Sequence, residues 1–93
     1  MKLQPDETSL NGRWIVENKR ARNDAVADRI EWLITNHLKR LTTAYDGWDT
    51  LYQDPDDGRF WEQTYPHSYM HGGGPMSLSM IAEADARTKY PAW

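Results

Sequence analysis

The segment at residues 54–75 gathers side chains that could do chemistry, and it reads DPDDGRFWEQTYPHSYMHGGGP. Its aspartates could bind a metal ion, its consecutive glycines could hold a phosphate, and its carboxylates and histidines could transfer a proton. A calcium-binding EF-hand loop needs oxygen ligands at its first, third and fifth positions and glycine at its sixth. Counted from Asp54, the fifth and sixth positions are Gly58 and Arg59. We therefore expect a turn here and no metal site.

The other two chemistries need partners that the sequence lacks. A phosphate-binding P-loop needs a Lys-Ser or Lys-Thr pair that leads into a helix, whereas these glycines lead into Pro75 and an alternating strand. Residues 71–74 read HGGG, as in the oxyanion hole of some lipases, but no G-x-S-x-G nucleophile motif accompanies them. The best acid–base pair is Glu62 with His67 or His71, and nothing in their spacing forces them together. We expect no enzymatic activity, catalytic residue or cofactor; a small hydrolase that uses Glu62 and His71 is the alternative.

The clearest element that the sequence predicts is a helix over residues 24–38, capped by Asn23 or Asp24. Apolar residues at helical spacing give this helix one stripe for the core. Trp32 falls on the opposite face, where it either packs under the N-terminal residues or waits for a partner. His37 lies on the apolar stripe, and we interpret it as a core histidine. The stripe consists of Val26, Ile30, Leu33, Ile34, His37 and Leu41.

Short alternating or aromatic runs around this helix predict antiparallel strands. Asp46-Gly47 and the segment at residues 54–58 are typical hairpin turns. The predicted fold is α+β: a small antiparallel sheet of about four strands packed by one main helix, with a short C-terminal helix. A flexible N-terminal arm (residues 1–9) precedes a single domain (residues 10–93). The predicted strands are residues 13–17, 41–45, 48–53, 59–65 and 76–80, with a loop at 18–23 and the short helix at 82–89.

One question about the sheet stays open at the level of sequence. The predicted strands at residues 48–53 and 59–65 carry aromatic side chains at both alternating sets of positions. A slip of one residue in strand pairing would exchange the two faces. The sequence therefore does not decide which of these aromatic residues point into the core.

The composition narrows the class of protein. The chain has no cysteine, so neither a disulfide framework nor a zinc–thiolate site is possible, and a reducing compartment suits it. No stretch is apolar enough for a signal peptide or a membrane segment, and we expect a cytoplasmic protein that does not bind membranes. Residues 44–66 hold six acids and one base, whereas the seven bases of residues 13–43 are dispersed among four acids. An acidic segment of this kind repels nucleic acid and attracts a basic protein.

Residues 47–66 read GWDTLYQDPDDGRFWEQTYP and are followed by HGGGP at residues 71–75 and by an alternating strand. In this order the motifs resemble the immunity protein 27 family, and the resemblance extends from Leu10 to Tyr90. It implies a cytoplasmic antidote of a bacterial polymorphic-toxin or contact-dependent competition system. Such a protein binds the toxic C-terminal domain of a cognate effector, one to one, and has no catalytic residues.

Because the resemblance transfers no catalytic residue, we interpret its motifs by shape and charge. Their glycines and prolines set the backbone, and their acids form the contact surface for a toxin. A nuclease toxin with a basic cleft would suit an acidic patch that mimics phosphate. The motifs could instead be purely structural, with the toxin contacts elsewhere. The predicted partner-binding residues are Asp49, Asp54, Asp56, Asp57, Glu62, Trp32 and His71.

A third interpretation concerns self-association. We expect a monomer or a weak dimer. Met76, Leu78 and Met80 alternate with Ser77 and Ser79, which predicts a half-buried strand. If this strand lay at a sheet edge, the chain could act as an adaptor that dimerises through it.

Overall fold

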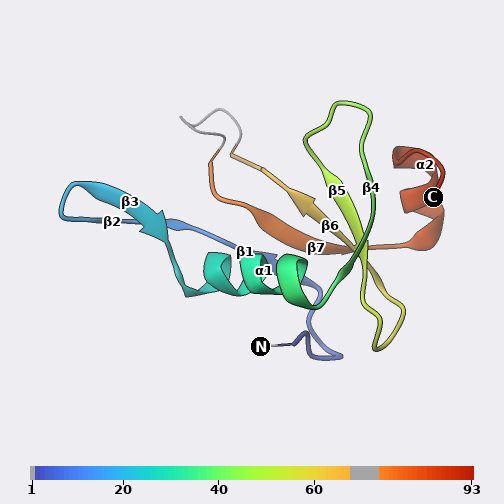
Figure 1. The fold of residues 1–93 in the computed structure, drawn as a ribbon, viewed down its shortest axis with the longest axis horizontal. Helices are drawn as coiled ribbons and strands as arrows, with labels where there is room; N and C mark the ends of the chain where they lie inside the picture. Colours follow the sequence, from blue (N-terminus) through green and yellow to red (C-terminus); the bar gives the residue numbers. More distant parts are fainter. Residues whose placement is uncertain (1, 68–73) are drawn as a thin grey trace.

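The computed structural model describes residues 2–67 and 74–93. Five strands form an antiparallel sheet in the order β1-β7-β6-β5-β4, and β2 and β3 form a separate hairpin (Figure 1). The α+β prediction is confirmed, with five strands in the main sheet rather than about four. The elements in chain order are β1 (Ser9–Asn11), β2 (Trp14–Glu17), β3 (Arg20–Asn23), α1 (Ala25–Asn36), β4 (Lys39–Thr43), β5 (Thr50–Gln53), β6 (Phe60–Thr64), β7 (Ser77–Ile81) and α2 (Glu83–Lys89).

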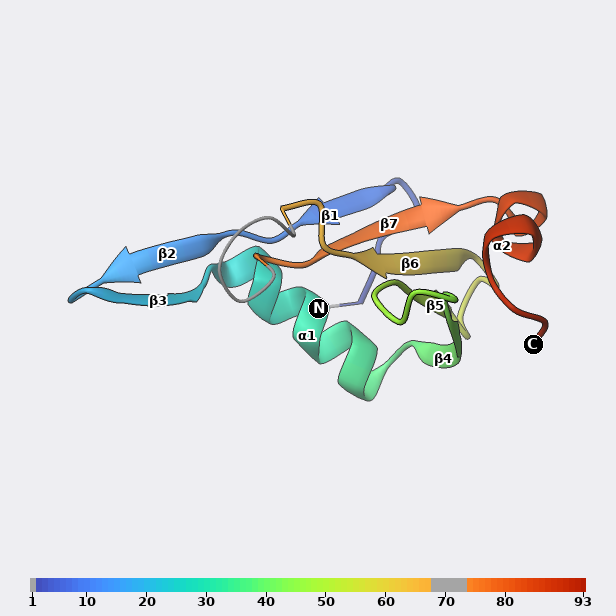
Figure 2. The same ribbon diagram turned by 90° about the horizontal axis from the view of Figure 1, so that it is seen from above.

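The two faces of the main sheet bury different side chains. Tyr52 in β5 lies opposite Trp61 in β6, and both belong to the cluster that packs under α1 together with Ile30. Leu51 points to the other face, where it packs with Tyr90 at the end of α2. The strand register thus decides which aromatic residues point toward α1, a question that the sequence leaves open. Figure 2 shows α1 below the sheet. The cluster under α1 consists of Leu10, Ile30, Leu33, Leu38, Tyr52, Trp61 and Leu78.

α1 begins where the sequence predicts, with Asp24 as its cap. The Asp24 carboxylate accepts a hydrogen bond from the Ala27 backbone N–H at 2.8 Å. The backbone N–H of Asp24 donates to the carbonyl of Arg13 at 2.9 Å, which joins the start of the helix to β2. The helix ends at Asn36, two residues before the predicted end, so Leu41 of the predicted stripe lies in β4 instead.

We expect Asp24→Ala to lower the free energy of unfolding by about 1 kcal/mol at neutral pH, because an orphan N–H of the first turn loses its acceptor. The hydrogen bond from Ala27 holds the pKa of Asp24 below its ordinary value. The contribution is therefore full above the unfolded-state pKa and disappears as the pH falls through the lower folded-state pKa. Urea unfolding of wild type and variant at pH 7 and at about pH 2 measures the difference in free energy of unfolding at each pH. A difference from wild type that is equally large at the two pH values would contradict the cap.

The N-terminal residues lie against α1 and the sheet. Glu7 forms an ion pair with Arg29 of α1 at 2.7 Å, and Arg59 donates to the Glu7 carbonyl, also at 2.7 Å. The Thr8 carbonyl accepts from the Met80 N–H of β7 at 2.8 Å. These contacts tie residues 7 and 8 to three different elements. The flexibility of residues 1–9 stays a prediction.

β2 and β3 form a hairpin that extends away from the sheet (Figures 1 and 2). The predicted strand at residues 13–17 is confirmed. The predicted loop at residues 18–23 is wrong, because residues 20–23 pair with β2. Asn18 and Lys19 both have positive φ, 52° and 63°, as the type I′ turn of a two-residue hairpin requires. None of the eight strand residues is buried, and Val16 is 75% exposed.

β7 confirms the predicted strand near residues 76–80 but not its predicted place. It lies between β1 and β6, so the idea of an exposed β7 edge for dimerisation is wrong. The predicted alternation also holds only in part. Leu78 is fully buried, but Met80 is 44% exposed. Ser77 is buried as well, and its hydroxyl is satisfied by donating to Asn11 at 3.1 Å.

The two predicted hairpin turns are present at opposite ends of β5. Gly47 and Gly58 both have positive φ, 80° and 78°, which glycine adopts without steric cost. The Gly58 N–H donates to the Asp54 carbonyl at 2.8 Å and closes the second turn.

Among residues 2–67 and 74–93, no helix combines the length and the apolar character that a membrane crossing requires.

Candidate functional site

The fold divides the predicted contact residues between the two ends of β5. Asp49 precedes β5 in the β4–β5 turn, and Asp54 follows β5 in the β5–β6 turn. In Figure 1 these turns lie on opposite sides of the sheet centre. The acidic segment of the sequence therefore forms two separate acidic regions rather than one patch. His71 lies outside the described residues.

At the β5–β6 turn, the predicted acids bond to the chain itself. Asp54 is 2% exposed, and its Oδ1 accepts from the Asp56 N–H at 2.8 Å and contacts His37 Nε2 at 3.1 Å. Asp57 accepts from both the backbone N–H and the side chain of Arg59, at 3.0 and 2.7 Å. The backbone hydrogen bond, followed by the guanidinium, holds the pKa of Asp57 below its ordinary value. These hydrogen bonds stabilise the turn that the sequence predicts at residues 54–58.

His37, Asp54 and Asp56 form a group that could share a cation. One ligand atom from each lies within 4.8 Å of the others. Histidine nitrogen and carboxylate oxygen are common ligands of transition metals. The Lys2 ammonium lies 3.4 Å from Asp56 Oδ2, so a cation of the chain already approaches this group. Trp32 stacks on His37 with ring centroids 6.3 Å apart, which places this predicted contact residue beside the same turn.

At the other end of β5, two acids hold a lysine. The Lys89 ammonium lies 2.9 Å from Asp49 and 2.8 Å from Glu62, and the Tyr90 hydroxyl donates to Glu62 at 2.9 Å. Burial disfavours the charge of Lys89, but hydrogen bonds to Glu62 and Asp49 outweigh it and raise the lysine pKa. Burial, and then the bond to Glu62, raise the pKa of Tyr90. Asp49 and Glu62 are site residues predicted from the sequence, whereas Lys89 and Tyr90, from the C-terminal helix and its end, are not.

Beside this lysine lies a pocket of about 330 Å³, which we call the acidic–aromatic pocket. Its lining residues are Asp46, Trp48, Asp49 and Tyr65. Trp48 is 54% exposed, and its ring meets the Tyr65 ring edge-on, with centroids 5.8 Å apart. The Asp46 carboxylate accepts from the backbone N–H of Trp48 at 2.9 Å and so fixes the backbone of the turn that carries the indole. Asp46 is therefore a site candidate, although in the sequence it served only to predict the hairpin turn at Asp46-Gly47.

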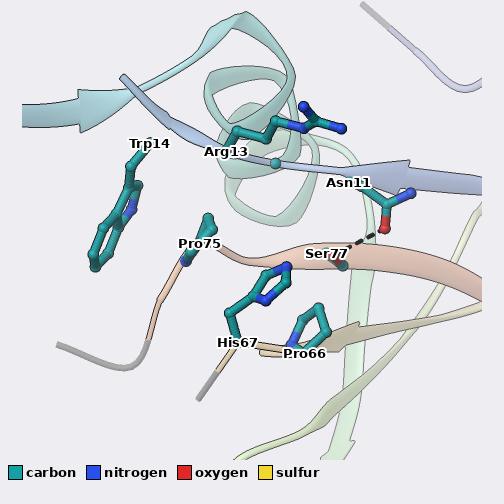
Figure 3. Close-up of a pocket in the computed structure, with 8 residues that line it drawn as sticks. Asn11, Arg13, Trp14, Pro66, His67, Pro75 and Ser77 are labelled. Atoms are coloured by element: carbon teal, nitrogen blue, oxygen red, sulfur yellow. Dashed lines mark hydrogen bonds between the residues drawn. The ribbon is translucent and has the colours of Figure 1, made fainter. Parts of the chain in front are cut away.

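A larger pocket, of about 610 Å³, lies at the base of the β2–β3 hairpin (Figure 3). The Ser77 hydroxyl is buried and donates to the Asn11 amide oxygen. An amide oxygen is too weakly basic to activate this serine as a nucleophile. Arg13 and His67 both line this pocket and come from two different segments (Figure 3). The ionisable residues of its lining are thus of basic types, unlike the aspartates of the acidic–aromatic pocket. The lining residues are Asn11, Gly12, Arg13, Trp14, Pro66, His67, Pro75 and Ser77.

The comparisons with known proteins agree with the resemblance seen in the sequence. The family model of immunity protein 27 matches residues 16–82, more than half of the chain. The matched range includes both turns of β5 and the acidic–aromatic pocket. Comparison with the curated proteins returned no match, and neither did comparison with the solved structures. The chain therefore belongs to the immunity protein 27 family.

Proposed function

We propose that this chain neutralises a cognate toxin domain by one-to-one association of the two proteins, without chemistry of its own. Family membership supports an immunity function. The observation that carries the binding step is the exposed surface around the β4–β5 turn. There Trp48 is 54% exposed and lines a pocket together with the carboxylates of Asp46 and Asp49. Exposed aromatic residues are enriched at protein contact surfaces, and neighbouring charges of one sign steer a partner of the opposite charge.

The charge of this surface supports a basic partner. Asp46, Asp49 and Glu62 outnumber Lys89, which leaves a local excess of negative charge. A toxin that binds nucleic acid presents a cationic cleft, which such a surface would fill in place of phosphate. We therefore propose a nuclease as the toxin class, with the association taking place in the cytoplasm.

The residues predicted from sequence fall into two roles in this proposal. Asp49 and Glu62 belong to the contact surface, together with Asp46. Buried Asp54 and half-buried Trp32 support the other turn, where Asp56 and Asp57 would form a second contact with the toxin. His71 stays a predicted contact.

The proposal is tested with the toxin domain encoded next to this chain. Expression of that domain alone should stop bacterial growth, and co-expression of this chain should restore it. The two proteins should copurify, and sedimentation should give one copy of each. Growth arrest that persists despite a folded, abundant chain would contradict the proposal.

Salt gives a sharper prediction. We expect the association rate to fall about tenfold or more between low salt and about 0.5 M NaCl, because steering between opposite charges is screened. Asp46→Asn/Asp49→Asn should lower the low-salt rate several-fold. Asp6→Asn/Asp85→Asn is the matched control, since it removes the same charge at two exposed positions elsewhere and should have a smaller effect. Stopped-flow kinetics measures the salt dependence and the rates of the two double variants. A rate indifferent to salt would count against steering.

A further inference from the structure

We infer that the acidic–aromatic pocket receives one arginine or lysine side chain of the toxin. This inference rests on the proposed function and names the chemistry of its central contact. The pocket volume of about 330 Å³ lies at the low end of the range of small-ligand pockets. It suits one long side chain rather than a folded element.

The aromatic walls favour an organic cation. A guanidinium or ammonium group is attracted to the faces of tryptophan and tyrosine rings. Trp48 offers an exposed indole that packs edge-on against the Tyr65 ring, and its backbone N–H is bonded to Asp46 in the same turn. Two of the four lining residues supply ring carbon rather than metal ligands, whereas hard metal ions need many oxygen ligands.

The carboxylates add the charge. Asp46 uses Oδ1 for the backbone N–H of Trp48, and Asp49 uses Oδ2 for Lys89. A carboxylate has two oxygens, so each aspartate retains, among residues 2–67 and 74–93, one that can accept from an incoming N–H. An arginine, with five N–H donors in a planar fork, can reach both aspartates at once and still stack on a ring.

The chain already binds its own cations in this manner. The Lys89 ammonium lies between Asp49 and Glu62 and 5.4 Å from the centre of the Tyr90 ring. Arg87 lies 4.5 Å from the ring centre of Trp93. The pocket next to Lys89 repeats this combination of carboxylate and ring, but it opens to solvent.

The first experiment needs no toxin. Titrating the ¹⁵N-labelled chain with N-acetyl-arginine methylamide should shift the indole N–H signal of Trp48 saturably; Trp48→Phe identifies that signal among the five tryptophans. N-acetyl-glutamine methylamide, of similar length but neutral, should not. Asp46→Asn should weaken the arginine response several-fold. Equal shifts with both probes, or an undiminished response in Asp46→Asn, would overturn the inference.

The second experiment uses the toxin domain. Trp48→Ala should weaken binding by about 30-fold or more, as loss of a central aromatic anchor does. The matched control is Tyr45→Ala, because Tyr45 is an exposed aromatic of the same turn that does not line the pocket; it should change affinity by less than about threefold. If wild-type chain binds the toxin and Trp48→Ala binds equally well, this inference fails while the proposed function stands. If wild-type chain does not bind the toxin, the proposed function fails, and the arginine titration alone decides what the pocket binds.

Discussion

Replacing Trp61 with alanine is expected to lower the free energy of unfolding by about 3 to 5 kcal/mol, the largest loss for any single change considered for this chain. Trp61 is fully buried in the middle of the sheet, where it pairs with Tyr52 and packs under α1. A small domain has only a few kcal/mol of stability, so the variant should be largely unfolded at 37 °C. Circular dichroism with urea unfolding measures the loss.

The indole nitrogen offers a control for this prediction. Trp61 Nε1 is buried and has no hydrogen-bond partner among the described residues, so its polar group does not contribute to stability through a bond. Trp61→Phe keeps a large ring and removes the unpaired N–H. It should therefore lose less than half of what the alanine variant loses. Equal losses in the two variants would mean that ring volume is not the source of the stability.

The ion pair of Glu7 and Arg29 gives the second large effect. The hydrogen bonds from the Arg29 side chain, and then the backbone of Gln4, lower the pKa of Glu7 from 4.5 to about 2. Because the folded-state pKa is the lower one, the stabilisation is complete above about pH 4.5 and is lost as the pH falls to about 2. Glu7→Gln should remove on the order of 2 kcal/mol at neutral pH and flatten the fall in stability over this window.

Carbon-detected NMR titration of the Glu7 carboxyl measures its pKa directly. A value near 4.5 would show that the N-terminal arm is detached in solution, which is the flexible arm that the sequence predicts. Glu17→Gln is the matched control. Glu17 also pairs with an arginine, Arg22, at 2.6 Å, but both side chains are more than half exposed, so this substitution should cost little.

Local sequence signals predicted the elements that follow local rules. The cap at Asp24, the glycine turns at Gly47 and Gly58, and the short helix after β7 all depend on residues that are neighbours in the chain. Each is specified by hydrogen bonds or backbone angles within a few positions. For such elements one sequence is sufficient.

The wrong or missing predictions concern features that only tertiary contacts determine. β3 reads RARN and buries nothing, so no hydrophobic pattern identifies it, and only its pairing with β2 makes it a strand. The candidate site has the same origin, because Lys89 reaches Asp49 and Glu62 only after α2 folds back onto the sheet. Contacts between residues 27 or more positions apart do not appear in any local window of sequence.

Residues 15–22, the outer part of the β2–β3 hairpin, are exposed throughout. Substitutions or small insertions there are nearly neutral for folding, because they remove no core contact. Many sequences of this hairpin are therefore compatible with the same fold of the rest of the domain, and selection can act on them directly. The hairpin is thus the part of the molecule where a descendant can acquire a new binding preference without first losing its fold.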